Sequence, residues 1–152
     1  MRGAILAVLM SVFVSMTAHA KEPASAAPVA ANAVPVGTLT LKGGSVAAGI
    51  GYTWGHGDLE YRNKTHEFTV KGISVVNVGA SKYTARGEVY DLKRIEDFAG
   101  NYVAAAAGVA VAGGATATYL KNEHGVVIKL IETDIGLQFN LAAEGVHIAL
   151  KN

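Results

Sequence analysis

The stretch of sequence that decides the fold is Asp58-Leu59-Glu60-Tyr61-Arg62-Asn63-Lys64-Thr65-His66-Glu67-Phe68-Thr69-Val70-Lys71. Apolar residues alternate with polar ones on both sides of Asn63-Lys64. Because side chains in a β-strand point alternately to the two faces of a sheet, Asp58 to Arg62 and Glu67 to Lys71 each form a strand with one apolar face. Asn63-Lys64 is a turn signal between them. The stretch therefore predicts a β-hairpin.

The same alternation recurs along the chain beyond Val36, where 17 of the 18 glycines lie and no proline occurs. Three further strands are predicted, over Val126 to Ile131, Leu137 to Leu141 and Val146 to Leu150. Turn signals separate the strands at short intervals: Lys42-Gly43-Gly44, Gly79-Ala80-Ser81, Asn122-Glu123-His124-Gly125, Thr133-Asp134 and Glu144-Gly145. Consecutive antiparallel hairpins are the natural interpretation.

Two segments depart from simple alternation. In Asp91 to Ala99 the apolar residues fall three apart, Asp91 is suited to cap a helix and Gly100 to end it, so a short helix is predicted. Tyr102 to Ala117 is almost wholly Ala, Val and Gly. Its glycines disfavour a helix, and we expect a buried strand there, followed by another over Ala115 to Leu120.

Together these patterns predict a mainly β protein. We expect an antiparallel β-sandwich or small barrel of about 7–9 short strands, with one short helix at about residues 91–99.

The N-terminal residues have the three parts of a secretory signal peptide. A positive start at Arg2 leads into an apolar run from Ala4 to Met16, and the segment closes on Ala18-His19-Ala20, which fits a signal peptidase. The apolar run is too short to span a bilayer. We expect cleavage after Ala20 and export to the periplasm or envelope of a Gram-negative bacterium. Residues 1–20 are then the signal peptide, residues 21–36 an Ala/Pro-rich disordered tether, and residues 37–152 a single β-rich domain.

Charge and cysteine usage narrow the function. Without Arg2 the exported chain carries 12 basic and 12 acidic side chains, so its net charge gives no reason to expect a nucleic acid partner. The chain has no cysteine, which excludes both disulfides and a lipid-modified N-terminal cysteine.

Two stretches carry a family resemblance that covers roughly residues 44 to 150. Gly49-Ile50-Gly51-Tyr52-Thr53-Trp54-Gly55-His56-Gly57-Asp58-Leu59 resembles the glycine-rich strand pair of SYLF domains, which are lipid-binding modules. Val89-Tyr90-Asp91-Leu92 with Ile95 and Asp97-Phe98, followed by the Gly/Ala-rich stretch, is similar to the C-terminal half of the EipA-type family of exported envelope-integrity proteins. The resemblance implies a small β-rich domain with one short helix and a role at the cell envelope. It brings no catalytic residues with it.

Candidate metal ligands are weak. His56 and His66 flank the predicted hairpin and could meet across it, with Asp58 or Glu67 as a third ligand for zinc. Their spacing matches no established metal motif, and solvent-exposed histidines are the alternative interpretation.

Enzymatic candidates are weaker still. Ser45, Ser74 and Ser81 lack the G-x-S-x-G turn that exposes a nucleophile, and the glycines from Gly43 to Gly57 lack the Lys-Ser/Thr of a phosphate-binding loop. We expect no enzymatic activity and no cofactor.

The aromatic residues provide the remaining candidates for a binding site. The predicted ligand-binding residues are Tyr52, Trp54, Tyr61, Arg62, Lys64, Lys82 and Tyr83, and Tyr90 and Tyr102 belong to the same aromatic set. Aromatic rings beside basic side chains suit a lipid headgroup or a glycan, whereas partly buried aromatics with a wet hydroxyl are the structural alternative.

The leading hypothesis is an exported, non-enzymatic protein that binds or scaffolds at the envelope, with membrane lipid or an envelope component as its partner. A small integral outer-membrane β-barrel is the first alternative, and a metal-dependent hydrolase that uses His56 and His66 is the second. The uncharged stretch from Val103 to Ala117 also predicts self-association if it is exposed.

Overall fold

The structure is a computed structural model, and it describes residues 28–30, 33–48, 50–74, 79–132 and 145–152. These residues form eight strands and two short 3₁₀ helices. The strands are β1 (Gly37–Ala48), β2 (Ile50–Tyr61), β3 (Lys64–Ser74), β4 (Gly79–Tyr90), β5 (Gly100–Ala110), β6 (Thr116–Asn122), β7 (Val127–Glu132) and β8 (Val146–Leu150). The 3₁₀ helices are η1 (Ile95–Phe98) and η2 (Ala112–Gly114).

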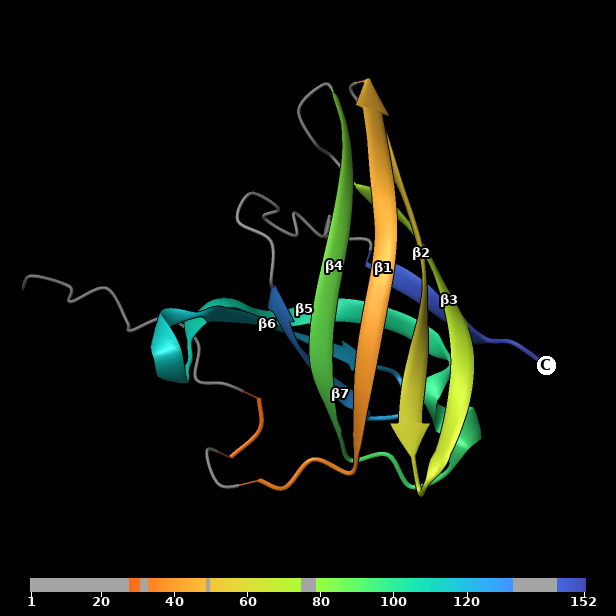
Figure 1. Ribbon diagram of the computed structural model, residues 1–152, viewed down its shortest axis with the longest axis vertical. Coiled ribbons are helices and arrows are strands. Elements are labelled where there is room, and N and C mark those ends of the chain that lie inside the picture. The colour runs from red at the N-terminus through yellow and green to blue at the C-terminus, as the bar shows by residue number, and fades with distance from the viewer. Residues whose placement is uncertain (1–27, 31–32, 49, 75–78, 133–144) are drawn as a thin grey trace, which may run out of the picture.

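The strands close into one antiparallel barrel in the order β1-β2-β3-β8-β5-β6-β7-β4. The prediction of an antiparallel β fold is confirmed, with the barrel rather than the sandwich as its form. Five of the eight described strands are longer than the short strands expected, since β1 to β5 each span 11 or 12 residues. In Figure 1, β1, β2 and β4 stand upright, while β5 and β6 cross them and run out past β4.

The predicted hairpin at 58–71 is confirmed as β2 and β3, whose register pairs Tyr61 with Lys64. The turn is formed by Arg62 and Asn63, one residue earlier than the expected Asn63-Lys64, because Lys64 already belongs to β3. Arg62 and Asn63 have φ of 50° and 61°, the left-handed conformation that a two-residue hairpin loop requires. The expected strands at Val126–Ile131, Val146–Leu150 and Ala115–Leu120 correspond to β7, β8 and β6. The expected strand at Leu137–Leu141 and the turn at Thr133-Asp134 lie outside the described residues.

The barrel interior is mainly apolar, and the inward side chains alternate most clearly along β2. Along β2 every second residue is buried, ending with Leu59 and Tyr61, and the residues between them are exposed. The largest fully buried side chains are Tyr102, Phe68, Phe98, Leu59, Ile128, Leu130, Val89 and Val126. Burial of this apolar surface is the main stabilising contribution, because the chain has no disulfide.

Two of the expected turns are wrong. Lys42-Gly43-Gly44 lies inside β1, and Gly79-Ala80-Ser81 begins β4 and pairs with β1. Gly43 is required for space rather than for a turn, because a Cβ there would meet the carbonyl oxygen of Trp54 and the ring of Tyr83.

The expected helix at 91–99 is also wrong in type and extent. Asp91 has φ of 59° and therefore cannot start a helix, and the only helical residues of this segment are the four of η1. The apolar residues that are spaced three apart nevertheless contact the core. Leu92 and Phe98 are buried, and Ile95 packs against them and their neighbours. The segment lies across the lower end of the barrel as Figure 1 is drawn.

The Ala/Val/Gly stretch is a strand, as expected, but it is not buried. Within β5 the buried residues are Tyr102 and Ala106, whereas Val103, Ala104 and Ala107 are exposed. Along its distal part, β5 pairs with β6. There it packs on an outer cluster formed by Tyr90, Ala106, Ala117, Tyr119 and Val127.

Part of the segment expected as a tether contacts the barrel. Val29 packs against the outer cluster, and the amide of Val36 donates a hydrogen bond to the carbonyl oxygen of Val89 at 2.8 Å. None of the helices in the described ranges is long and apolar enough to cross a membrane.

Candidate functional site

An apolar patch lies on the outer face of the barrel, toward the upper ends of β1, β2 and β3 in Figure 1. It consists of Val46, Ile50, Tyr52, Trp54 and Ile73, which are between 42% and 78% exposed. The register joins three of them in one row across the sheet, because Val46 pairs with Tyr52 and Tyr52 pairs with Ile73. Exposed large apolar side chains that adjoin one another in this way mark an interaction site more often than a passive surface.

The two aromatic rings of the patch are arranged face to face. Tyr52 and Trp54 are two residues apart on β2 and therefore point to the same side. Their ring centroids lie 6.1 Å apart with an angle of 21° between the planes. The stacked pair gives the patch a broad, rigid and amphipathic centre, since both side chains have few rotatable bonds and one polar end.

Three lysines frame the patch on the same outer face. Lys71 of β3 pairs with Trp54 of β2. Lys82 of β4 pairs with Gly44 of β1, which itself pairs with Trp54. Lys42 of β1 pairs with His56 of β2, one row below. All three side chains are exposed.

Acidic residues are separated from this surface. Among the described positions on the outer face of the upper half, from Lys42 to His56 and at Thr69, Lys71, Ile73, Lys82 and Thr84, there is no Asp or Glu. The nearest acidic positions down the strands are Asp58, Glu67 and Glu88. Asp58 is four residues from Trp54, which is roughly 13 Å along an extended strand. Among the described positions, the upper outer face is therefore apolar and positively charged.

The predicted ligand-binding residues do not all converge. Tyr52, Trp54 and Lys82 lie together in the apolar patch and its lysine frame. Tyr83 is beside Lys82 in sequence but faces the barrel interior, where its hydroxyl donates a hydrogen bond to the Trp54 carbonyl oxygen at 3.1 Å. Burial raises the pKa of the Tyr83 hydroxyl to about 12. Tyr83 therefore supports the strand that carries Trp54 and does not contact a ligand on the outer face.

Tyr61, Arg62 and Lys64 lie at the opposite end of β2 and β3. Tyr61 is seven residues from Trp54, roughly 23 Å along the strand. Its buried hydroxyl donates a hydrogen bond to the Lys93 carbonyl oxygen at 2.9 Å, and the Arg62 guanidinium lies 5.0 Å from the centre of the Tyr61 ring. These contacts hold the segment before η1 against the hairpin, so Tyr61 and Arg62 have a structural role.

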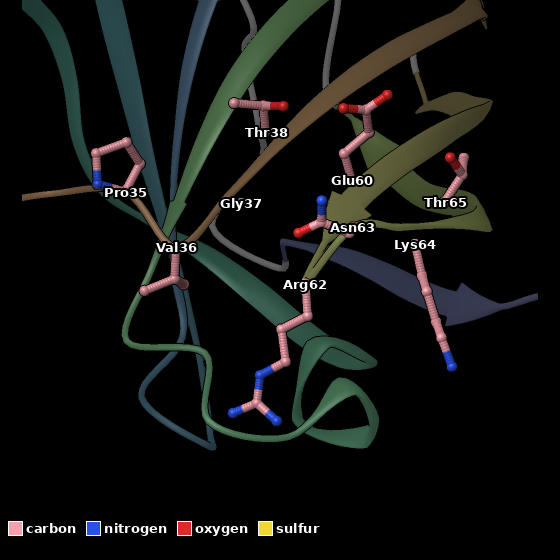
Figure 2. A pocket seen from close by; sticks show the side chains of 9 residues that line it. All are labelled: Pro35, Val36, Gly37, Thr38, Glu60, Arg62, Asn63, Lys64 and Thr65. Carbon is pink, nitrogen blue, oxygen red and sulfur yellow. The ribbon is translucent and has the colours of Figure 1, made fainter.

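A shallow groove of about 440 Å³ adjoins this lower end and is lined by residues 35–38, 60 and 62–65. Figure 2 shows that the Arg62 and Lys64 side chains extend away from those of Thr38 and Glu60. The polar groups of the groove therefore do not converge on a common point, which a specific small-molecule site requires.

The other aromatic candidates are interior or packed residues. Tyr102 is fully buried and its hydroxyl donates a hydrogen bond to the Phe98 carbonyl oxygen at 2.8 Å. Tyr90 belongs to the outer cluster, and its hydroxyl donates a hydrogen bond to Glu88, which also pairs with Lys129 at 2.9 Å.

The two histidines considered as metal ligands point to opposite faces of the sheet. His56 pairs with Thr69 on the outer face, whereas His66 pairs with the buried Leu59 on the inner face. The part of the chain that the structure describes contains no group of three His, Asp or Glu side chains that could hold a metal ion.

Sequence reasoning missed several members of the site. Val46, Ile50 and Ile73, and also Lys42 and Lys71, were not among the candidates. The signal for Ile50 is present in the sequence, because Ile50, Tyr52 and Trp54 alternate with the small residues Gly51, Thr53 and Gly55. An apolar face of a strand is ordinarily assigned to the core, yet here the small residues face inward and the large ones outward.

The fold resembles that of a solved structure. The crystal structure of a β-barrel-like, uncharacterised protein from Brucella abortus superposes with a TM-score of 0.55 over 76% of this chain and 72% of that one, at 24% sequence identity. No protein-family model matches the chain, and no curated protein matches it either. At this identity the likeness establishes the fold, which is a small β-barrel.

Proposed function

We propose that this chain is an exported, non-enzymatic β-barrel that binds peripherally to an anionic lipid surface of the cell envelope. The observation that carries the proposal is the apolar patch on the outer face with its lysine frame. Export is supported by the three-part N-terminal segment, and a binding role by the packed interior of the barrel, which leaves the outer surface to contact a partner.

The composition of the patch fits the interface of a bilayer. Trp and Tyr are favoured at the level of lipid headgroups because their rings are apolar at one end and polar at the other. Ile50 and Ile73, at 78% and 51% exposed, are the side chains best placed to enter the acyl region. Burying an aliphatic side chain of this kind contributes about 1.5–3 kcal/mol.

The charges fit an anionic rather than a neutral surface. Each lysine close to an anionic bilayer contributes about 1 kcal/mol, and Lys42, Lys71 and Lys82 all lie on the face that carries the patch. The acidic residues of the outer face begin with Asp58, Glu67 and Glu88. Asp58 lies one row below Lys42, whereas Lys71 and Lys82 lie farther up the sheet and provide most of the attraction.

Trp54 provides a direct test because it is the only tryptophan of the chain. On vesicles that contain anionic phospholipid, we expect its fluorescence to shift to shorter wavelength and to be quenched by lipids brominated on the acyl chain. Vesicles of zwitterionic lipid alone should give a much smaller response. No shift with either vesicle, or an equal shift with both, contradicts the proposal.

Matched variants separate the patch from nonspecific adsorption. Ile50→Asp should abolish the response, and Lys82→Glu should weaken binding about fivefold or more, since about 1 kcal/mol per lysine corresponds to that factor. Arg86→Glu is the control, because Arg86 is exposed on the outer face of β4 four residues farther down. If Arg86→Glu weakens binding as much as Lys82→Glu, the patch is not the binding surface.

The distribution of apolar and polar residues over the two faces of the barrel disfavours both alternatives, the integral outer-membrane barrel and the metal-dependent hydrolase. An integral outer-membrane barrel faces lipid with an apolar band and encloses a polar interior. Here the interior is apolar, and the outer face of β2 carries Asp58 and Glu60. Extraction of membranes with alkaline carbonate should therefore release the protein, whereas an integral barrel would be retained. A hydrolase that uses His56 and His66 would need both imidazoles on one face, and the register of β2 and β3 separates them.

A further inference from the structure

His56 lies on the outer face of β2, one row below Trp54. Its side chain is exposed and it pairs with Lys42 of β1. The row above it carries Trp54 with Lys71 on one side and Lys82 on the other. Directly paired side chains on one face of a sheet have Cβ atoms about 4.5–5.5 Å apart, and diagonal neighbours lie about 7–8 Å apart. His56 is therefore close enough to add its own charge to that of the lysine frame.

Histidine is the side chain whose charge changes near neutral pH. An imidazole gains a proton, and with it a positive charge, as pH falls from about 8 to 5. Lysine and aspartate side chains keep their charges over most of this interval. A change of pH in this interval therefore alters the charge of the outer face at His56, while the lysines beside it stay charged.

The charged groups around His56 come from three strands. Lys42 lies opposite His56 on β1, and Lys71 and Glu67 are its diagonal neighbours on β3. On β2 itself, Asp58 is the next residue on the same face. His56 therefore lies between the basic upper part and the acidic lower part of the outer face, and its proton extends the basic part by one position.

The other three described histidines are placed differently. His66 faces the inner side of the sheet, and His124 is in the turn between β6 and β7. His147 is on the outer face, where it pairs with Lys71. The Glu123 carboxylate interacts electrostatically with both His124 and His147. A positive charge on either of these two is therefore partly balanced by a nearby carboxylate.

We propose that protonation of His56 strengthens the binding of this chain to an anionic lipid surface as pH falls below neutrality. The inference rests on the proposed membrane function and concerns the regulation of the same face. An anionic surface attracts the imidazolium together with the lysines, and it offsets the repulsion between the imidazolium and Lys42. Because binding and protonation are linked, the lipid favours the proton as much as the proton favours the lipid.

Co-sedimentation with vesicles at two pH values tests this regulation. Vesicles of phosphatidylglycerol and phosphatidylcholine are suitable, because the phosphate of phosphatidylglycerol stays ionised over the interval. We expect an affinity about fivefold higher at about pH 5.5 than at about pH 7.5, the factor for one added charge near an anionic surface. Equal affinity at the two pH values overturns the regulation but leaves membrane binding standing. No binding at either pH overturns both.

Two substitutions of His56 separate its proton from the other titrating groups. His56→Gln is polar but uncharged, so its affinity should change less than about twofold between the two pH values. His56→Lys is charged at both, so it should bind at about pH 7.5 as tightly as the original chain does at about pH 5.5. His147→Gln is the matched control on the same outer face and should keep most of the pH dependence. If His56→Gln keeps the full change, or His147→Gln abolishes it, the proposal is overturned.

Proton uptake on binding gives a second readout, which a merely structural role of His56 would not produce. Calorimetry of vesicle binding at about pH 6.5, in two buffers with different ionisation enthalpies, measures the protons that the complex takes up. We expect net uptake with the original chain and with His147→Gln, and almost none with His56→Gln. Binding of the original chain without proton uptake contradicts the linkage.

Discussion

At the scale of single residues, two aromatic rings inside the barrel lie opposite glycines. A Cβ added at Gly57 would come within 2.5 Å of the Phe68 ring, and one at Gly43 within 2.5 Å of the Tyr83 hydroxyl oxygen. The barrel is narrow, so a large inward side chain on one strand requires a small residue on the next. The glycines of β1 and β2 therefore belong to the packing of the core.

Gly55 allows this packing to be measured. A methyl group there would lie 2.9 Å from the Tyr83 hydroxyl oxygen and 3.1 Å from both Leu41 and the Lys42 carbonyl oxygen. We expect Gly55→Ala to lower the free energy of unfolding by about 1–3 kcal/mol. In a Tyr83→Phe background, which removes the hydroxyl, the same substitution should cost less. Urea denaturation of the two single variants and the double variant gives this difference, and an equal cost in both backgrounds would show that Tyr83 is not the limiting contact.

Local sequence could identify some of these positions and not others. The hairpin at 58–71 was predictable because its alternation and its turn are both local in sequence. Lys42-Gly43-Gly44 was misinterpreted as a turn because the reason for Gly43 is the Tyr83 ring, some 40 residues away in the chain but directly across the sheet. A glycine required by a distant neighbour looks the same in sequence as a glycine required by a turn.

At the scale of elements, the segment from Asp91 to Ala99 closes one end of the barrel. Phe98 is fully buried and meets Phe68 edge-on, with ring centroids 5.2 Å apart, and Tyr102, with centroids 6.3 Å apart. The segment is also held by side chains of the barrel, because Asn122 donates a hydrogen bond to the Asp97 carbonyl oxygen at 2.8 Å. Tertiary contacts therefore hold a segment whose helical part is too short to be stable alone.

Removing the Phe98 side chain tests the importance of this closure. We expect Phe98→Ala to lower the free energy of unfolding by about 3–5 kcal/mol, since it leaves a cavity beside two other aromatic rings. Ile73→Ala is the matched control, because Ile73 is half exposed and its truncation should cost less than about 0.5 kcal/mol. Both values follow from chemical denaturation. Similar losses in the two variants would show that the segment does not contribute to the core.

Sequence reasoning recognised the apolar spacing of this segment but assigned it to a longer helix. The spacing of Leu92, Ile95 and Phe98 is equally compatible with an irregular segment whose apolar side chains pack against the core. In the folded chain Asp91, directly after β4, is left-handed with φ of 59°, and no helix starts there. For β5 the limit is different, because alanine and valine occur in buried and in exposed strands alike, and only the exposure of Val103, Ala104 and Ala107 in the folded chain distinguishes the two.

At the scale of the whole molecule, the barrel brings together charges that are far apart in sequence. Lys42, Lys71 and Lys82 come from three strands, and only the closed register places them around Trp54. The net charge of the chain conceals this arrangement, since basic and acidic residues nearly balance. Composition excluded a uniformly basic surface but could not show that one half of the outer face lacks acidic residues among the described positions.

The buried tyrosines link the stability of the whole barrel to alkaline pH. Burial raises the pKa of Tyr83 to about 12, and it also raises the pKa of Tyr102. In the unfolded chain both hydroxyls lose their protons near pH 10, whereas in the folded barrel they keep them to higher pH. The folded state therefore binds more protons than the unfolded state above pH 10, and the free energy of unfolding falls as pH rises from about 10 through 12.

We expect thermal or urea unfolding measured between neutral pH and pH 12 to show constant stability below about pH 10 from this source and a progressive loss above it. Tyr83→Phe removes one of the titrating groups, so its stability should fall less steeply over the same interval, although the variant is less stable at neutral pH by about 1 kcal/mol through loss of the hydrogen bond to Trp54. Tyr52→Phe, which replaces an exposed tyrosine of the apolar patch, is the control and should retain the slope of the original chain. If Tyr83→Phe and Tyr52→Phe lose stability with the same slope, the alkaline transition does not arise from the interior of the barrel, and the packing of Tyr83 against Gly43 and Gly55 would have to be less tight than the structure indicates.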